Sequence, residues 1–365
     1  MKKLLTVLLA VLMVLGLAAC GNKPADEPVV DDKTIDTLTI SFVPSKDADV
    51  ILTAAEPLKD ILKAKLAEKG YTVNNVDISV GTDYSASGEG MISGSIDIGF
   101  IPASTYVLYH PDGVELLCEA LRFGVGDANH KVIDPKDGIA PWNEGITTDA
   151  DGMATGYASL IYVNIATEKG ADLYEKAVAG TLTWEDVDSA AWYVCSSTSS
   201  AGYVYPSIWL NDNFGEGAGA GKKTVADLSN VTPDGSYANM MAALLTGQVD
   251  VTVGYADVRK DAASTENFEA AYADEIAAGT YANVWDVVKV IAVSPYIMND
   301  TISVAPQSKD PKMTPEFVKA LQESFIEIGQ TEEGLKCVEP YAHKGYTIGS
   351  DSDYDGTRAA NALFQ

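Results

Sequence analysis

Hydrophobic and polar residues alternate between strand-like and helix-like patterns along the N-terminal part of the folded chain. Residues 38–43 alternate apolar and polar side chains, which predicts a strand, and residues 48–68 repeat apolar side chains at helical spacing. The same patterns predict a strand over 73–80, a helix over 85–93 and a strand over 96–101. Strand, helix and strand in this order indicate an α/β fold with a mixed or parallel sheet and right-handed crossovers.

A short internal echo indicates that this α/β arrangement occurs twice. Residues 91–98 read Met-Ile-Ser-Gly-Ser-Ile-Asp-Ile, and residues 244–251 read Leu-Leu-Thr-Gly-Gln-Val-Asp-Val. In each segment a helix would end at a glycine, Gly94 or Gly247, before a strand that is entered through one aspartate. We therefore expect two similar α/β lobes, with ligand groups at the carboxyl ends of their strands.

The order of segments suggests how the chain divides between the lobes. A hydrophilic stretch rich in Gly, Asp, Pro and Asn interrupts the pattern, and after it the strand and helix patterns resume. Late in the chain a strand is predicted over 301–304, and a helix is predicted over 314–328, capped by Thr314 before Pro315. The expected division is lobe 1 over 37–123 and 295–365, an insertion with the first crossing over 124–156, lobe 2 over 157–286, and the second crossing over 287–294.

The N-terminus has the pattern of a bacterial lipoprotein signal. Lys2 and Lys3 precede an apolar run over 4–15, and small residues lead to Cys20, which would become the lipidated first residue after cleavage. The alternative is an ordinary secretory signal with a chance cysteine. Residues 21–36 are polar and acidic, which suits a disordered tether. The sequence thus predicts an extracytoplasmic protein that is lipid-anchored to the bacterial cell membrane.

Charge and cysteine content exclude several classes of protein. The formal net charge of −27 excludes nucleic acid as a partner, because phosphate backbones require basic surface. Beyond Cys20, the three cysteines Cys118, Cys195 and Cys337 are an odd number and lack metal-ligand spacing. We expect no disulfide framework, no metal, no cofactor and a monomer. The 25 basic residues include only three arginines, so an anionic ligand is expected to be held mainly by hydroxyls and backbone N–H groups.

The most informative segment is a run of five hydroxyl residues, 196–200. It follows an apolar strand-like stretch and precedes a helix predicted from Tyr203 to about Asn213. Free N–H groups at a helix start carry partial positive charge, and adjacent hydroxyls add further donors, so this arrangement favours a small oxyanion. The alternative is an ordinary helix cap, for which one or two hydroxyls would suffice.

Several motifs together resemble the phosphate/phosphite/phosphonate-binding proteins of ABC importers. The resemblance runs from about Leu38 to Tyr341 and rests on the segments 42–45, 54–58, 82–84, 94–100, 197–206 and 294–300. It implies a two-lobed periplasmic-binding-protein-like fold, a type II Venus flytrap with two hinge crossings. The implied partners are a small oxyanion such as a phosphonate, phosphite or phosphate ester, and the permease of an ABC importer.

The resemblance also implies a set of ligand-binding residues. Carried over position by position, they are Ser197, Thr198, Ser199 and Ser200, with Tyr84 and Tyr106 facing them from lobe 1 and Asp257 following a strand of lobe 2. One position departs from the pattern. Aminoalkylphosphonate binders of this family tend to have Gly-Ser-His-Asp/Glu, whereas here the segment 235–238 reads Gly-Ser-Tyr-Ala. The missing carboxylate at Ala238 disfavours an aminated ligand, Tyr237 offers an aromatic wall, and Asp257 could still accept a hydrogen bond from a P–OH.

Two other functions stay open on the sequence alone. One is a binder of another small ligand, such as a cofactor precursor, on the same fold. The other is a secreted serine hydrolase or phosphatase with its nucleophile in the hydroxyl run, although the chain lacks Gly-x-Ser-x-Gly and has only three histidines. The acidic turn 351–356 copies half of a calcium loop, but Ala362 stands where the loop needs Glu, so a solvated turn is expected. We expect a binding protein rather than an enzyme.

Overall fold

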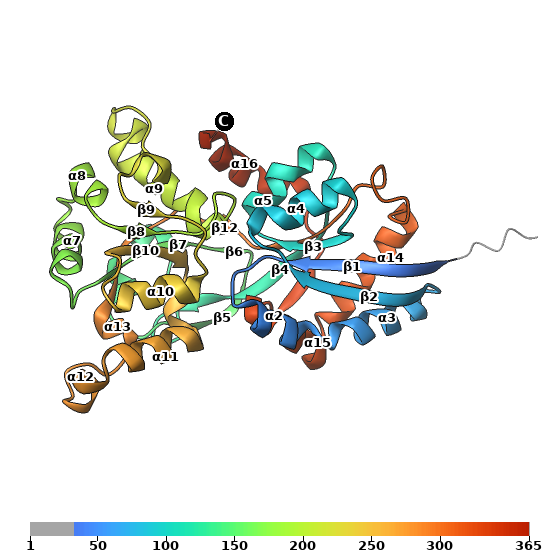
Figure 1. The fold of residues 1–365 in the computed structure, drawn as a ribbon, viewed down its shortest axis with the longest axis horizontal. Coiled ribbons are helices and arrows are strands. Elements are labelled where there is room, and N and C mark those ends of the chain that lie inside the picture. The colour runs from blue at the N-terminus through green and yellow to red at the C-terminus, as the bar shows by residue number, and fades with distance from the viewer. Residues whose placement is uncertain (1–32, 365) are drawn as a thin grey trace, which may run out of the picture. The chain divides into compact units, whose positions relative to one another are not determined.

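The computed structural model describes residues 33–364, and the signal, Cys20 and most of the tether predicted above lie outside them. The described residues from Ile35 onward form one compact unit, and of the residues before it only Lys33 and Thr34 are described. In residues 33–364 the strands form a seven-stranded sheet, a five-stranded sheet and a two-stranded sheet. We name the elements around the seven-stranded sheet the first lobe and those around the five-stranded sheet the second lobe (Figure 1).

The sheet of the first lobe is mixed, with strand order β14-β4-β13-β3-β1-β2 and β5 paired to β4. Its strands are β1 (Thr34–Phe42), β2 (Thr72–Val80), β3 (Ile98–Ile101), β4 (Glu115–Gly126), β5 (Thr148–Ala154), β13 (Thr301–Val304) and β14 (Gly345–Thr347). β1 and β3 are parallel, with Ile40 opposite Ile98, whereas β13 runs antiparallel to both β3 and β4. The late segment 301–304 therefore returns to the first sheet.

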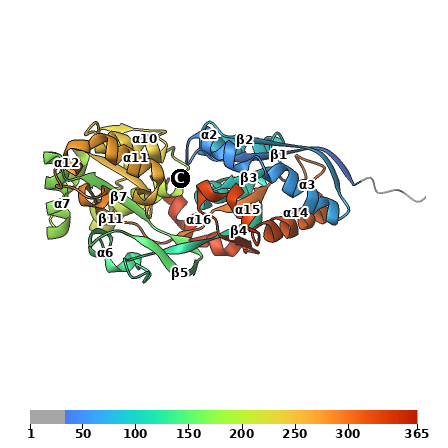
Figure 2. The same cartoon turned by 90° about the horizontal axis from the view of Figure 1, so that it is seen from below.

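Helices cover both faces of this sheet (Figures 1 and 2). They are α2 (Ala48–Ala55), α3 (Leu58–Glu68), α4 (Tyr84–Ser93), α5 (Ala103–Tyr109), α14 (Pro315–Ile328), α15 (Glu332–Cys337) and α16 (Asp355–Asn361). The helix expected over 48–68 is two helices, because Pro57 lacks the N–H that a continuous helix needs. Other ends are as expected: Gly94 ends α4 in the left-handed region with φ 78°, and the Thr314 hydroxyl accepts the Phe317 N–H at the start of α14.

The second lobe is built on a sheet of order β11-β7-β10-β8-β9. Its strands are β7 (Ser159–Asn164), β8 (Trp192–Tyr193), β9 (Val231–Thr232), β10 (Val251–Tyr255) and β11 (Val288–Val293). Its helices are α6 (Ala140–Asn143), α7 (Glu168–Ala179), α8 (Trp184–Asp188), α9 (Tyr205–Phe214), α10 (Tyr237–Leu245), α11 (Ala262–Ala271), α12 (Ala273–Ala277) and α13 (Val284–Val287). Both sheets are enclosed by buried apolar side chains, so each lobe has its own layered α/β core.

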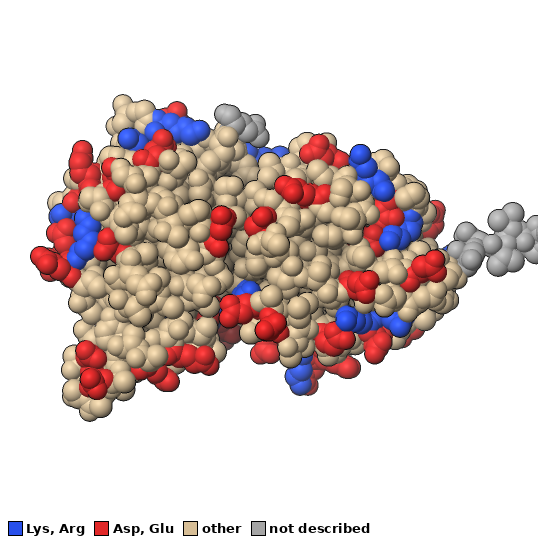
Figure 3. Space-filling view, viewed as in Figure 1, with Lys and Arg blue, Asp and Glu red and all other residues tan. Residues whose placement is uncertain are grey.

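The chain passes from the first sheet to the second through β6 (Gly156–Tyr157) and returns through β12 (Ile297–Met298). These two segments pair antiparallel, with Ile297 opposite Tyr157, and lie between the lobes in Figure 1. The C-terminal helix α16 also touches both lobes, because Asn361 donates to the Ser104 carbonyl and Thr357 lies 3.3 Å from the Tyr205 hydroxyl. Acidic side chains are spread over both lobes in Figure 3 rather than gathered in one patch.

Candidate functional site

A cavity of about 640 Å³ lies between the lobes and draws residues from both of them. The first lobe contributes Lys46, Tyr84, Arg122, Asp300 and Tyr341, and the second contributes Ser199, Ser200, Tyr237, Tyr255 and Asp261, with Tyr157 from β6. Its size lies within the range of about 300–1,000 Å³ that is usual for small-molecule sites. We call it the cleft cavity.

The hydroxyl run supplies the second-lobe wall of the cleft cavity. The expected helix begins as a π-helical turn, Ser200–Val204, and continues as α9. The buried Ser199 hydroxyl accepts the Gly202 N–H at 3.1 Å, and it lies 3.4 Å from the Tyr237 hydroxyl. A side chain at Gly202 would collide with Cys195, so the glycine lets the turn close on the strand before it. Ser199 therefore serves as a helix cap and also faces the cavity.

The other hydroxyls of the run have different environments. The Ser200 hydroxyl accepts the Ser104 N–H of α5 at 3.0 Å, and the Thr198 carbonyl accepts the Thr105 hydroxyl at 3.1 Å. Both bonds join the two lobes. Ser197 is exposed and is not among the residues that line the cleft cavity, whereas Ser200 is. Much of the run therefore holds one lobe against the other beside the cavity.

Tyrosines from opposite lobes meet next to Ser199. The hydroxyls of Tyr237, Ser199 and Tyr84 all contact the Cys195 thiol, whose pKa burial raises to about 12. Burial also raises the pKa of both tyrosines well above the ordinary value of a phenol. These side chains are therefore neutral O–H donors near pH 7, and neutral donors do not repel an anion.

Two residues implied by the resemblance lie apart from this group. The Tyr106 hydroxyl donates to Asp351 at 2.6 Å, and Tyr106 is not among the residues that line the cleft cavity. The Asp257 carboxylate is fully buried and accepts hydrogen bonds from Arg259 (2.6 Å to Nη2), Thr147 and Tyr162. Burial alone would raise the pKa of Asp257, but the Arg259 charge outweighs burial and lowers it. The Asp257 carboxylate is thus committed to structural partners.

Arg122 is the arginine that lines the cleft cavity, and the sequence analysis did not single it out. It lies near the end of β4, forms an ion pair with Asp300 and places its guanidinium over the Tyr157 ring at 5.0 Å. Burial alone would lower the pKa of Arg122, but Asp300 raises it, so the guanidinium keeps its charge. Its buried Nε–H has no acceptor among residues 33–364. The available signal was an arginine in a mostly apolar strand sequence.

The partner of Arg122 belongs to a buried network in the first lobe. Asp300 also lies 3.4 Å from His343 Nε2, and the Tyr346 hydroxyl lies 3.1 Å from the other ring nitrogen. Burial alone would raise the pKa of Asp300, but Arg122 and His343 lower it. Burial lowers the pKa of His343 more than Asp300 raises it, so the imidazole is neutral near pH 7. The network therefore anchors a single guanidinium at the cavity wall.

A different ion pair, between Lys46 and Asp261, joins the two lobes across the cleft. Lys46, in the loop after β1, contacts both the Tyr255 hydroxyl and the Asp261 carboxylate of the second lobe. This contact joins the lobes on the side of the cavity where Ala238 and Glu266 also lie. Asp261 is thus already neutralised by a lysine from the opposite lobe.

Neither a metal site nor a membrane-spanning helix is found in the part of the chain that the structure describes. No group of His, Cys, Asp and Glu in residues 33–364 could hold a metal ion, and no helix there is long and apolar enough to cross a membrane. Cys118, Cys195 and Cys337 are buried free thiols. In the acidic turn, Asp351 pairs with Arg358.

Comparisons with known proteins agree on the fold. A search of curated proteins found no match. A binding protein component of an ABC phosphonate transporter from Pseudomonas aeruginosa shares 15% identity, with 89% of this chain and 85% of that chain covered and a TM-score of 0.57. PhnD1 from Prochlorococcus marinus, solved with methylphosphonate, shares 12% identity over 90% and 98% of the two chains, with a TM-score of 0.58. A Xanthomonas citri protein bound to ATP shares 12% identity over 90% and 97%, with a TM-score of 0.57.

At these identities the solved structures establish the two-lobed α/β fold, which confirms the fold class expected from the sequence. The family assignment comes from the sequence itself. The family model for the periplasmic phosphonate substrate-binding protein of ABC transporters matches residues 40–354, which is most of the chain. The chain therefore belongs to the family of periplasmic phosphonate-binding proteins of ABC transporters.

Proposed function

We propose that the cleft cavity captures a small phosphonate or a related tetrahedral oxyanion, and that Arg122 supplies the charge that holds it. The observation that carries the proposal is the position of Arg122. Its guanidinium lines the cavity, its Nε–H lacks an acceptor among the described residues, and Asp300 keeps it in place. A charge-assisted bond from arginine to an oxyanion is stronger than a bond between neutral groups.

The donors around Arg122 suit the remaining oxygens of such a ligand. Ser199 and Tyr237 lie on one wall of the cleft cavity and Tyr84 on the other, so a ligand between them would bridge the lobes. Binding that bridges two lobes favours a closed state, and we propose that the paired crossings β6 and β12 act as the hinge. No histidine lines the cleft cavity among residues 33–364, and a binding role needs no general base.

Calorimetry with methylphosphonate, phosphite and phosphate tests this proposal directly. At least one of these anions should bind with one-to-one stoichiometry and should raise the melting temperature, because it binds the folded chain and not the unfolded chain. If none of them binds at millimolar concentration, the proposed function is wrong.

The sequence features outside the described residues complete the proposal. Cys20 would be lipidated, the residues between Cys20 and the start of β1 at Thr34 would tether the folded unit to the membrane, and a monomer would deliver its ligand to the permease of an importer. Cys20→Ala should release the protein from the membrane fraction of an expressing bacterium, and it should leave ligand binding unchanged. A Cys20→Ala protein that stays in the membrane fraction would contradict the lipid anchor.

A further inference from the structure

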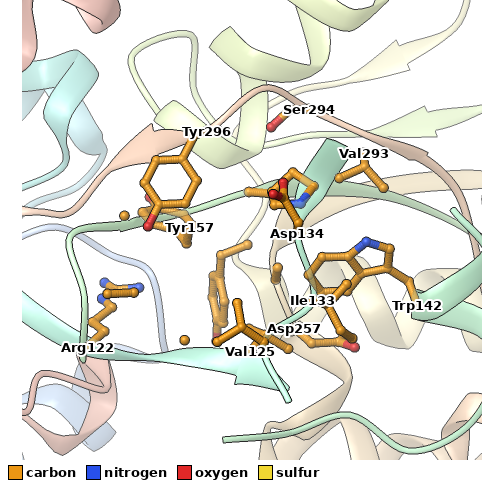
Figure 4. A pocket seen from close by; sticks show the side chains of 18 of the residues that line it. Arg122, Val125, Ile133, Asp134, Trp142, Tyr157, Asp257, Val293, Ser294 and Tyr296 are labelled. Carbon is orange, nitrogen blue, oxygen red and sulfur yellow. The ribbon is translucent and has the colours of Figure 1, made fainter. Parts of the chain in front are cut away.

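A second, larger cavity lies beside the cleft cavity. It has a volume of about 1050 Å³ and shares Arg122, Tyr157 and Tyr255 with the cleft cavity as common wall residues. Figure 4 shows Arg122 at one end of this cavity and Trp142 at the other, with Val125 and Ile133 between them. We call it the side cavity. Arg122 therefore lines both the cleft cavity and the side cavity.

The insertion expected over residues 124–156 builds one wall of the side cavity. β4 continues into this segment and pairs with β5, and the chain between them turns back so that Val132 bridges to Gly126. The lining of the side cavity is largely apolar and aromatic: the insertion contributes Val125, Ile133 and Trp142, and other segments contribute Phe123, Trp209 and Tyr296. A small oxyanion alone gains nothing from an apolar wall, because the ion has no apolar surface to bury against it.

Five of the ten charged residues that line the side cavity are in ion pairs. Asp257 is bound by Arg259, and Lys260 is paired with Asp149. Lys344 lies over the Phe123 ring at 5.5 Å. On the wall shared with the cleft cavity, Lys260 and Asp261 are paired with Asp149 and Lys46, and Arg122 offers a guanidinium. Glu339 also lies on this shared wall, and most of the remaining lining of the side cavity is apolar. This arrangement is complementary to a molecule that is anionic at one end and apolar at the other.

We infer that the preferred ligand is an organophosphonate with a bulky apolar or aromatic substituent, whose head binds Arg122 and whose substituent fills the side cavity. The inference rests on the proposed function, since it needs the oxyanion at Arg122. It goes beyond that function by assigning the side cavity a role in ligand choice. It also gives the insertion a purpose, because the insertion forms the wall against which the substituent packs.

Calorimetry with benzylphosphonate and methylphosphonate tests the inference. Benzylphosphonate should bind the unmodified protein at least about tenfold more tightly, which is the scale of discrimination that a hydrophobic pocket provides for added apolar groups. Val132→Trp places a large side chain at a half-exposed position of the side-cavity wall and should remove that advantage. Methylphosphonate affinity should stay unchanged in this variant. Val125→Trp, from the neighbouring strand, should have the same effect and serves as a second variant if one of them fails to fold.

Val178→Trp is the matched control, because Val178 is an exposed valine on α7 that lines neither cavity. It should keep the full preference for benzylphosphonate. Equal or weaker binding of benzylphosphonate than of methylphosphonate by the unmodified protein would overturn the inference and leave the proposed function intact. A preference for benzylphosphonate that survives both Val132→Trp and Val125→Trp would also overturn it. Failure of both phosphonates to bind would overturn the inference, and it would overturn the proposed function as well if phosphite and phosphate also failed to bind.

Discussion

The two walls of the cleft cavity are assembled in different ways. On the second-lobe wall, the hydroxyl donors Ser199 and Ser200 lie on one continuous segment that follows β8 and begins a helical turn. The first-lobe wall depends on Arg122, Asp300 and His343, which lie on three segments far apart in the sequence and meet in a buried network. The comparison indicates that the local motif provides hydroxyl donors and backbone shape, whereas the distributed network provides the positive charge.

Removal of the guanidinium should have the largest effect if this comparison is right. Arg122→Gln keeps a polar side chain but deletes the charge, and we expect the dissociation constant for methylphosphonate to rise by roughly 30-fold or more, because a buried charged partner is lost. Calorimetry measures the change. Arg358→Gln is the control, since Arg358 pairs with Asp351 and Asp355 and lines neither cavity. Similar affinities in both variants would mean that the hydroxyl wall alone binds the ligand.

Loss of a hydroxyl from the second-lobe wall should have a smaller effect. Ser199→Ala should weaken binding by about 1–3 kcal/mol, the range for a hydrogen bond to a charged group, and should cost on the order of 1 kcal/mol of folding stability as a lost cap. Ser197→Ala is a matched control two residues away, because Ser197 is exposed. Titrations and melting curves of both variants separate the two contributions. A Ser199→Ala protein with reduced stability but unchanged affinity would leave the turn with a purely structural role.

The difference in affinity between an aminated and an unaminated phosphonate should be smaller still. We expect 2-aminoethylphosphonate to bind severalfold more weakly than methylphosphonate, because the ammonium is costly to desolvate and neither Asp257, which is committed to Arg259, nor Asp261, which is paired with Lys46, is free to receive it. Lys46→Met should reduce this difference in affinity by releasing Asp261, and Ala238→Asp should reduce it by adding the missing carboxylate. Calorimetry with both ligands measures the difference in each protein. Tighter binding of the aminated ligand by the unmodified protein would show that a carboxylate of the cavity already accepts the amine.

The distributed network also predicts a modest pH dependence of folding. Burial lowers the pKa of His343 below its unfolded value, so the unfolded chain binds a proton that the folded chain does not. The stability that the neutral imidazole contributes is therefore complete above the ordinary pKa of histidine and declines as pH falls toward the folded pKa. His343→Gln should flatten the stability curve between pH 7 and pH 5, by on the order of 1 kcal/mol. Denaturant titrations at several pH values give the free energy of unfolding of the unmodified protein and of His343→Gln. If the two proteins show the same pH dependence, His343 is not a neutral, buried histidine.

The sequence predicted the parts of the fold that depend on neighbouring residues. The strand 301–304, the glycine end of α4 at Gly94 and the Thr314 cap of α14 all follow from local patterns and are confirmed. The helix expected over 48–68 was wrong at Pro57, where helical spacing continues although the backbone donor is missing. The spacing of apolar residues shows which face of a helix they occupy, but it does not show whether the helix is continuous.

The site could be predicted only where its residues are close in sequence. The hydroxyl run was recognisable, and the structure places Ser199 and Ser200 at the cleft cavity. The role implied for Asp257 depended on a free carboxylate, but Arg259, two residues later, folds back onto it. Arg122 could not be paired in advance with Asp300, because 178 residues separate them and only the sheet brings β4 beside β13. Pairings set by sheet topology carry no local signature.

The contacts of α16 with both lobes have a consequence for sensor engineering. Thr357 faces Tyr205 of the second lobe, while Asn361 holds the Ser104 carbonyl of the first. If the lobes move relative to each other, α16 can keep both contacts only if it shifts as well; otherwise one of the two contacts breaks. A fluorophore attached to α16, outside both cavities, would then convert ligand capture into an optical signal without occupying the binding site.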